Sequence, residues 1–390
     1  MREDFLLLNP GPVPVTREVR EAMAEPMVSH RSAEFEAVYE RAQDQLDYVF
    51  TRSTLDGTTT AEDGTSLILN GTATMGMEAA VANTVDEDGE VVAVVNGKFG
   101  RRFRRIADRY ASVTAVEFDW GDPVDVDAVE AAVTAETDVV TIVHNETSTG
   151  LLNPVAAVGD IAADNDATYV VDGVTSIGGD EFRIDDWKVD VAVVDAQKAL
   201  AAPPGLSAVY VTGDAEAAID GDRAPFYEDL DWHLRKAESH QTPFTSAVPL
   251  FRGLAVAVED IRDEGMADRI ERHRVQARAF REAFHAMGLE SFPDLNEHSA
   301  YSNTVTAMAL PESISGDDST EFFDAVAERG VSISGGQAHL GGEIFRVSNM
   351  GNLTGEHVLR GIRTVGEALE AVGVDADTAG ALETAREQLR

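Results

Sequence analysis

The first two thirds of the chain contain short runs of continuously apolar, mostly β-branched residues. These runs lie at 66–70, 91–95, 113–117, 138–144, 168–172, 191–195 and 208–212. Continuous rather than alternating apolar character is typical of strands buried on both faces of a largely parallel sheet. Helix-like segments separate most of the runs, at 74–84, 99–109, 125–135 and 154–164. The alternation predicts an α/β fold, with a largely parallel seven-stranded sheet and helices on both faces.

The last third of the chain has a different pattern, with long amphipathic stretches and fewer apolar runs. Residues 249–287 predict a long helix that is interrupted near Glu264 and Gly265. Strand-like segments follow at 301–310, 331–334 and 344–350, and further helices are expected near 319–329, 355–371 and 376–389. This mixture predicts a smaller C-terminal α+β domain.

The length of the chain bears on how these segments divide into domains. A single core stops growing beyond about 250–300 residues, so a chain of 390 residues predicts more than one domain. We expect an N-terminal segment over 1–20 that packs near the functional site, a large α/β domain over 21–260 and a small domain over 261–390. The acidic, turn-rich stretch 53–65 is predicted to be a solvent loop.

Composition narrows the classes of partner and the compartment. The net charge is −39, which disfavours nucleic acid and anionic membranes because both need basic patches. A hydrophobic content of 44% argues against disorder and favours a globular protein with an acidic surface, as in halophiles. No apolar run approaches the ~18 residues of a membrane span, and no signal peptide is evident. With no cysteine in the chain, we expect no thiolate chemistry, no metal site and a cytoplasmic location.

Lysine is scarce, and this makes one lysine conspicuous. Only four of the 31 basic residues are lysines, namely Lys98, Lys188, Lys198 and Lys236. Lys198 lies in "VVDAQKALAAPPG", directly after a predicted buried strand, and strand ends are where ligands bind in α/β sheets. Burial would lower the pKa of its amine and make it nucleophilic. The other three lie in polar strings and fit ordinary surface charges.

Asp172 ends another predicted strand, "TYVVD", at the same edge of the sheet. Any one of 70 acidic residues is usually a surface charge. A carboxylate that follows three buried positions, however, needs a cationic partner. The protonated ring nitrogen of pyridoxal 5′-phosphate (PLP) is such a partner, and a lysine amine is the group to which PLP attaches.

Four further features could belong to a cofactor or substrate site, but each is weak evidence on its own. The turn "LNGTATMGMEAA" (69–80) leads into a helix and would suit a phosphate, although such turns are also plain connectors. Phe99 offers a ring for stacking, but an aromatic there is more often core. The hydroxyls of "HNETSTG" (144–150) fit either a cofactor or a turn. Arg346 lies in an apolar strand-like run, where a buried guanidinium must be paired and can bind a carboxylate in a bidentate way.

Taken together, these strings resemble the class V aminotransferases, in particular the alanine–glyoxylate/serine–pyruvate group. The resemblance extends over nearly the whole chain, from "LLNPGPVPV" (7–15) and "PMVSHRSAEF" (26–35) to "FRVSNMG". Its most specific part is the pair Asp172 and Lys198 followed by "KALAAPPG". It implies a fold type I PLP enzyme, here from a halophile, that forms a homodimer with shared active sites.

The resemblance also implies a role for each matching residue. Lys198 would be the Schiff-base lysine and Asp172 the partner of the ring nitrogen, with Phe99 stacked on the ring and Thr147 near it. Arg346 would bind the substrate carboxylate beside the turn that contains Gly11. The phosphate would be held by Thr72, Ala73, Thr74, Gln197 and, from the partner subunit, Thr245. Three departures from the family pattern occur: Gly71-Thr72-Ala73-Thr74 replaces Gly-Ser-Gly-Thr, Phe99 stands at the stacking position that is often Trp, and Asp195-Ala196 replaces Gly-Ser before Gln197.

The expected reaction is transamination between a small amino acid, alanine or serine, and a 2-oxoacid, glyoxylate or pyruvate. An acidic or phosphorylated substrate such as aspartate or phosphoserine is the alternative, because phosphoserine aminotransferases share the string His30-Arg31-Ser32, which could bind an acidic side chain. The alanine–glyoxylate group has the same string, so it does not decide between the two. Cysteine desulfurase chemistry is excluded because the chain has no cysteine. A non-catalytic acidic binding protein that retains the fold is a remote alternative.

Overall fold

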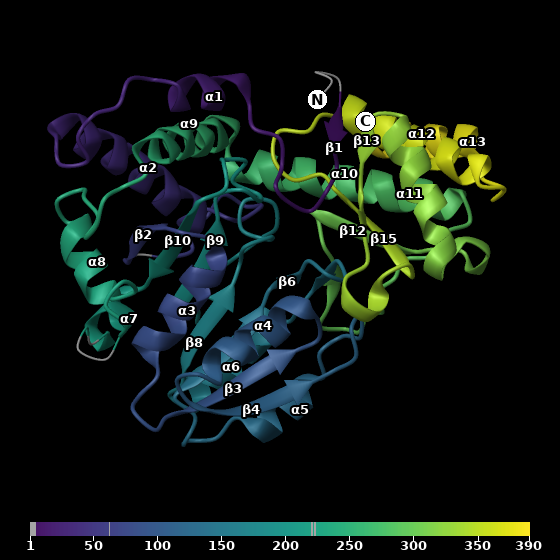
Figure 1. Ribbon diagram of the computed structural model, residues 1–390. Helices are drawn as coiled ribbons and strands as arrows, with labels where there is room; N and C mark the ends of the chain where they lie inside the picture. The colour runs from purple at the N-terminus through teal and green to yellow at the C-terminus, as the bar shows by residue number, and fades with distance from the viewer. Residues whose placement is uncertain (1–4, 62, 220, 222–223) are drawn as a thin grey trace.

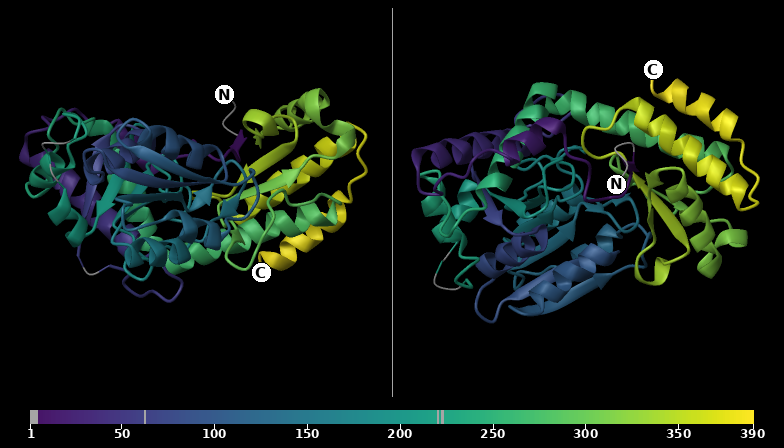
Figure 2. Two further views of the ribbon diagram at one scale, coloured as in Figure 1. Left: turned by 90° about the horizontal axis from the view of Figure 1, so that it is seen from below. Right: turned by 45° about the horizontal axis from the view of Figure 1, so that its top comes forward.

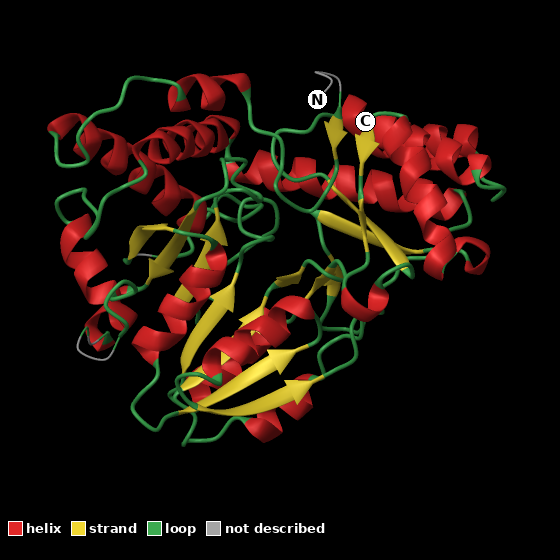
Figure 3. Ribbon diagram, in the orientation of Figure 1, coloured by secondary structure: helices red, strands yellow, loops and turns green. Residues whose placement is uncertain are grey.

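A seven-stranded sheet forms the centre of the larger part of the molecule (Figure 1, Figure 3). The structure, a computed structural model, describes residues 5–61, 63–219, 221 and 224–390. The strand order is β2-β10-β9-β8-β5-β3-β4; β10 is antiparallel to both neighbours and the other adjacent pairs are parallel. The strands are β2 (Thr65–Asn70), β3 (Glu90–Val95), β4 (Ser112–Glu117), β5 (Val139–Val143), β8 (Thr168–Asp172), β9 (Val191–Asp195) and β10 (Leu206–Val211).

All seven predicted strands are confirmed, with ends that shift by at most two residues. The prediction that each is buried on both faces is wrong for β4. This strand lies at one edge of the sheet, and its residues are exposed or half-buried, whereas β2 at the opposite edge is mostly buried. The other six strands consist mainly of fully buried residues, as their continuous apolar character predicts.

Helices cover both faces of this sheet. The chain moves along the sheet in one direction through α3 and α4 and in the opposite direction through α5 and α6. Right-handed crossovers therefore place the two pairs on opposite faces, and α3 packs on α4 as α5 packs on α6. None of the helices that the structure describes is long and apolar enough to cross a membrane. The helices of this part are α1 (Arg17–Met23), α2 (Ala33–Thr51), α3 (Ala73–Thr84), α4 (Lys98–Ala107), α5 (Val126–Ala132), α6 (Val155–Asp164), α7 (Gly213–Ala218), α8 (Leu230–Ala237) and α9 (Val248–Glu264).

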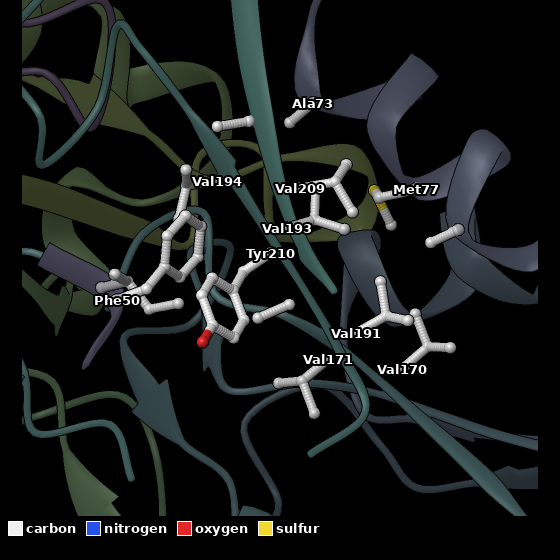
Figure 4. Packing of buried hydrophobic residues seen from close by; sticks show 14 of the residues in the cluster. Phe50, Ala73, Met77, Val170, Val171, Val191, Val193, Val194, Val209 and Tyr210 are labelled. Atoms are coloured by element: carbon white, nitrogen blue, oxygen red, sulfur yellow. The ribbon is translucent and has the colours of Figure 1, made fainter. Parts of the chain in front are cut away.

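The main core extends on both sides of the central strands. In β10, Val209 pairs with Val193 of β9 on the face that packs against α3, whereas the next residue, Tyr210, points to the other face (Figure 4). There its ring lies 5.2 Å from that of Phe50 in α2. Burial of each side chain of this size stabilises the folded state by about 1.5–3 kcal/mol. This packing holds the strand ends in fixed positions.

The C-terminal part has its own core, packed around a small antiparallel sheet of order β12-β15-β14. The N-terminal strand β1 joins this part by pairing in parallel with β13, and the C-terminus lies there as well (Figure 1, Figure 2). Its helices are α10 (Met266–Ala286), α11 (Ser319–Glu328), α12 (Gly355–Ala371) and α13 (Thr378–Gln388), with short 3-10 turns at Glu312–Ile314, Gly316–Asp318 and Ala338–Leu340. The strands are β1 (Leu6–Leu7), β12 (Val305–Ala309), β13 (Val331–Ser332), β14 (Ser334–Gly335) and β15 (Ile344–Ser348); β11 (Ala300–Tyr301) instead pairs with β7 (Leu151–Leu152), which pairs with β6 (Asn145–Glu146).

The sequence predictions for the C-terminal half are partly confirmed. The break at Gly265 is confirmed, because this residue has φ +84° and separates α9 from α10. The single strand expected over 301–310 is wrong, since the segment divides into β11 and β12.

The solvent loop expected over 53–65, in the N-terminal half, is also partly wrong. Position 62 lies outside the described residues, but Ser53 is fully buried and its carbonyl accepts a hydrogen bond from the amide of Phe182. The domain boundaries remain a prediction.

Candidate active site

A cavity of about 580 Å³ lies at the carboxyl ends of the parallel strands. The chain leaves β2, β3, β5, β8 and β9 at this edge, and the residues that follow each strand line the cavity. Ten of the eleven predicted site residues lie in it. These ten are Gly11, Thr72, Ala73, Thr74, Phe99, Thr147, Asp172, Gln197, Lys198 and Arg346.

Lys198 is the buried amine of this cavity. It follows β9 in a turn, and only 8% of its surface is exposed. Its Nζ donates a hydrogen bond to the carbonyl of Pro10 and lies 5.8 Å from the centre of the Phe99 ring. Burial lowers the pKa of Lys198 to about 8, although the carboxylates of Asp195 and Asp172 raise it. A lysine with this pKa is partly neutral near pH 8 and is therefore a competent nucleophile.

Asp172 is the buried carboxylate at the end of β8. It is 4% exposed, and one of its oxygens accepts a hydrogen bond from the backbone N–H of Val174 at 2.9 Å. Burial raises the pKa of Asp172 to about 7, while the Val174 N–H and the charge of Lys198 lower it. A carboxylate held in this way is stabilised by any cation that enters the cavity.

The anion-binding side of the cavity is the amino-terminal end of α3. Thr72 is the N-cap of this helix, but its side chain makes no capping hydrogen bond. The hydroxyl of Thr74 accepts a hydrogen bond from Nη1 of Arg102 at 2.7 Å, and the same guanidinium lies 4.9 Å from the centre of the Phe99 ring. The helix end and Arg102 together provide a positive environment for a phosphate group.

Arg346 enters the cavity from β15 of the C-terminal part and is 3% exposed. Its Nη1 donates to the carbonyl of Thr147 at 2.8 Å, and Nε and Nη2 both donate to the carbonyl of Gly335. These bonds use three of the five N–H groups of the guanidinium and leave one on each terminal nitrogen, which is the pair that binds a carboxylate. Burial lowers the pKa of Arg346 to about 10, and the charge of Glu146 opposes that shift.

Gly11 shows why the N-terminal segment belongs to this cavity. Its φ is +113°, and a Cβ at this position would lie 2.7 Å from Oε1 of Gln197 and 2.9 Å from Cδ of Lys198. A side chain would therefore collide with the lysine. The turn at Pro10–Pro12 forms one wall against which the Lys198 side chain is held.

This architecture and constellation match a known family. The family model described as "Aminotransferase class-V" matches residues 5–350. This chain belongs to the class-V aminotransferase family. It is therefore an aminotransferase, and it has the fold of the PLP-dependent enzymes of that family, as the sequence predicts.

Similar proteins cover almost the whole chain. An uncharacterized aminotransferase of Methanocaldococcus jannaschii is 36% identical over 98% of this chain and 97% of the relative. An L-aspartate–glyoxylate aminotransferase of Paracoccus denitrificans is 33% identical, over 98% and 95% of the two chains. The crystal structure of pyridoxamine–pyruvate aminotransferase from Mesorhizobium loti superposes with a TM-score of 0.88 at 26% identity, over 98% and 96%.

The cavity of this class-V aminotransferase provides most of the groups that PLP needs. Lys198 would supply the amine, Asp172 a buried carboxylate for the ring nitrogen, and Phe99 a ring for stacking. The amino-terminal end of α3 would supply donors for the phosphate. One group does not suit a phosphate: the carboxylate of Asp195 already accepts a hydrogen bond from the amide of Ala73.

Several site residues of the aminotransferase were not predicted. Arg102 and Asp195 line the cavity, and Lys98, which the sequence analysis assigned to the surface, does so as well. That assignment is wrong because Lys98 is the first residue of α4, a position that "VNGKFG" does not reveal. Glu146 is fully buried behind the cavity, and its carboxylate accepts hydrogen bonds from the amides of Phe99 and Gly100. It thereby fixes the start of α4 and the position of the Phe99 ring.

Thr245 is the one predicted site residue that lies outside the cavity. It is exposed, and its carbonyl accepts a hydrogen bond from Asn70 at 3.4 Å. The predicted role of its hydroxyl is toward a partner subunit and stays a prediction. Exposed aromatic side chains pack on its sequence neighbour Phe244: Phe226, which is 73% exposed, lies 5.7 Å from the Phe244 ring, and the ring of Tyr227 stacks on it at 4.6 Å.

Proposed function

We propose that this aminotransferase uses PLP, attached at Lys198, to transfer the amino group of alanine or serine to glyoxylate or pyruvate. The observation that carries the proposal is that Lys198, Asp172 and Arg346, from three separate elements, converge on one cavity. The relatives support this reaction class, because their names describe transfers to glyoxylate or pyruvate.

Each of these residues has a distinct part in the reaction. PLP, when bound, supplies an electron sink for the bond that is broken at the substrate's α-carbon. Asp172 holds the proton on the ring nitrogen. Once the substrate's amino group has displaced it from PLP, the Lys198 amine would take the proton from the substrate's α-carbon, which its lowered pKa permits near pH 8, and would deliver that proton to the cofactor carbon C4′. Arg346 binds the carboxylate shared by all amino acids and 2-oxoacids, and so aims the α-carbon at Lys198.

Reductive trapping tests this assignment. Borohydride treatment of the PLP-loaded protein, followed by peptide mapping, is expected to place the adduct on Lys198. An adduct on Lys98, Lys188 or Lys236 would overturn the mechanism. A screen of single amino acids, followed through the absorbance of the bound cofactor, then identifies the amino donor.

An acidic donor such as aspartate or phosphoserine is a second candidate, and Lys98 favours it. The Lys98 ammonium lines the cavity and makes no hydrogen bond or ion pair with the described residues. Burial, then Arg102 and Arg346, lower the pKa of Lys98, although Glu146 raises it. A cation at a helix amino-terminus is unfavourable, so a second carboxylate or a phosphate on the substrate would relieve this position.

Substitution of Lys98 distinguishes the two candidates. In the Lys98→Met variant, kcat/KM for aspartate should fall about tenfold or more while kcat/KM for alanine changes little, if an acidic donor is used. The matched control is Lys188→Met, which removes a lysine that does not line the cavity. Equal changes for alanine and aspartate would remove support for the acidic donor.

We further propose that the enzyme is a homodimer adapted to molar salt. Thr245 and the exposed rings of Phe226 and Tyr227 lie on the face that we assign to the partner subunit. An exposed aromatic cluster of this kind is typical of an interface. The net charge of −39 with only four lysines supports a halophilic origin.

A further inference from the structure

Asp195 is a second carboxylate in the cavity, and it lies at the amino-terminal end of α3. One of its oxygens accepts a hydrogen bond from the amide of Ala73 at 3.2 Å, and the other accepts one from the amide of Gln197 at 3.4 Å. The residue is 5% exposed. Ala73 is the first residue of the helix, so this carboxylate takes an N–H that the helix end offers to an anion.

The proposed function gives the same N–H groups to the phosphate of PLP. That phosphate carries a charge of about −1.5 to −2 near neutral pH. Two anions at one helix end repel each other, and they do so more strongly where water is excluded. The inference below rests on the proposed function, because it concerns how this chain holds its cofactor.

We propose that the Asp195 carboxylate competes with the cofactor phosphate for the amino-terminal end of α3. The charge of Asp195 then sets how much more tightly the cavity holds PLP than it holds pyridoxal, which has no phosphate. Few charged groups offset this competition. Burial raises the pKa of Asp195. The positive charge of Lys198, which lies in the same turn, lowers that pKa.

The elements around Asp195 contribute little other charge. From α3, Ala73 and Thr74 are uncharged. From β10, Ser207 is opposite Asp195 in the strand register and is uncharged. From β8, the cavity receives Asp172, and from α4 it receives Arg102, whose guanidinium bonds Thr74. A fall in pH that protonates Asp195 therefore removes a negative charge from the phosphate site.

The test compares the affinities for PLP and pyridoxal in the full-length, cofactor-free protein in molar KCl. At pH 8, Asp195→Asn should lower the Kd for PLP about tenfold or more, since asparagine loses the charge and has one acceptor oxygen for the two amides, of Ala73 and Gln197, that the carboxylate binds. The Kd for pyridoxal should change less than about twofold, because pyridoxal lacks the phosphate. Because burial raises the pKa of Asp195, the difference in PLP affinity between wild type and Asp195→Asn should shrink as the pH falls.

A matched control is available in the same strand. Asp190 precedes β9 at its opposite end, and its carboxylate accepts a hydrogen bond from the amide of Tyr169 at 2.7 Å. Burial raises the pKa of Asp190 as well. Because it does not line the cavity, Asp190→Asn should leave both Kd values unchanged, and thermal melts verify that both variants fold.

Three outcomes would overturn the inference. An unchanged or weaker PLP affinity in Asp195→Asn would show that the carboxylate does not compete with the phosphate. An equal gain in pyridoxal affinity would show that Asp195 acts on the part of the cavity that binds the ring instead of the phosphate. Reductive trapping separates this failure from that of the proposed function: an adduct away from Lys198 overturns both, whereas an adduct on Lys198 with unaltered affinities overturns only the role of Asp195.

Discussion

Replacing Asp172 by asparagine should stabilise the cofactor-free protein and at the same time abolish most of its activity. Burial raises the pKa of Asp172 from 3.8 to about 7. The folded state therefore keeps a proton that the unfolded state releases above pH 4. The stability that this proton provides is fully present below pH 3.8 and is lost as the pH rises toward 7. A shift of this size corresponds to about 4 kcal/mol above pH 7.

Asparagine at position 172 is neutral at every pH and can still accept the hydrogen bond from Val174. The Asp172→Asn variant should therefore avoid the loss of stability that deprotonation of Asp172 causes in the wild type. A chain of 390 residues unfolds with an entropy of about 0.8 kcal/mol/K, so 4 kcal/mol is about 5 °C in Tm. Between pH 5 and pH 8, the Tm advantage of the variant should grow by about 3 °C. Turnover should fall by roughly 10²–10⁴, because the ring nitrogen of PLP would lose the partner that keeps it protonated.

The assay is thermal unfolding of the cofactor-free protein at pH 5 and pH 8, together with turnover of the PLP-loaded protein. Asp180→Asn is the matched control, since burial also raises the pKa of Asp180 to about 7 but this residue does not line the cavity. It should show the same pH trend in Tm and keep its turnover. A Tm advantage of Asp172→Asn that does not change with pH would contradict the titration, and near-normal turnover would contradict the catalytic role.

The remaining predictions concern substrate binding, the wall of the cavity and salt. Arg346→Ala should weaken every amino acid and oxoacid by about 2–5 kcal/mol, measured as KM; a change for one substrate alone would make Arg346 a selector of side chains. Gly11→Ala should displace Lys198 and lower PLP affinity in a cofactor titration, because its Cβ would lie 2.9 Å from the lysine side chain; unchanged affinity would refute that contact. Dilution from about 3 M to about 0.05 M KCl should dissociate the dimer and release PLP, since Thr245 would come from the partner; light scattering and cofactor absorbance together test this, and a dimer that keeps its cofactor at the lowest salt would contradict it.

The strands could be predicted from the sequence because six of them are buried on both faces and therefore consist of unbroken apolar residues. The strand β4 was found from its apolar run as well, but its exposure was not, since β2 and β4 both end the sheet, both have apolar runs, and only β4 is exposed. The division of 301–310 into β11 and β12 depends on pairing with β7, a segment about 150 residues away, and no local pattern contains that information.

The centre of the site was predictable for a topological reason. Strand ends converge at one edge of a parallel sheet, so Asp172 and Lys198 were expected to lie together although 26 residues separate them. Glu146 was missed because its part is to hold the amides of Phe99 and Gly100, a contact between strand β6 and the first turn of α4 that no local pattern contains. Lys98 was missed because a lysine in a polar string is usually exposed, and only its position at the start of α4 places it in the cavity.

The charge of the cavity is opposite to that of the protein, and this links the acidic surface to the chemistry. Lys98, Arg102, Lys198 and Arg346 give the lining four cations, against the carboxylates of Asp172 and Asp195. The proposed 2-oxoacid substrates and PLP are anions, whereas alanine and serine are zwitterions, and a chain of net charge −39 repels the anions at long range. At molar ionic strength the Debye length is about 3 Å, so the surface charges no longer act on an approaching anion and only the cavity lining does. Salt would therefore permit this surface to be acidic without excluding the anions that the site must bind.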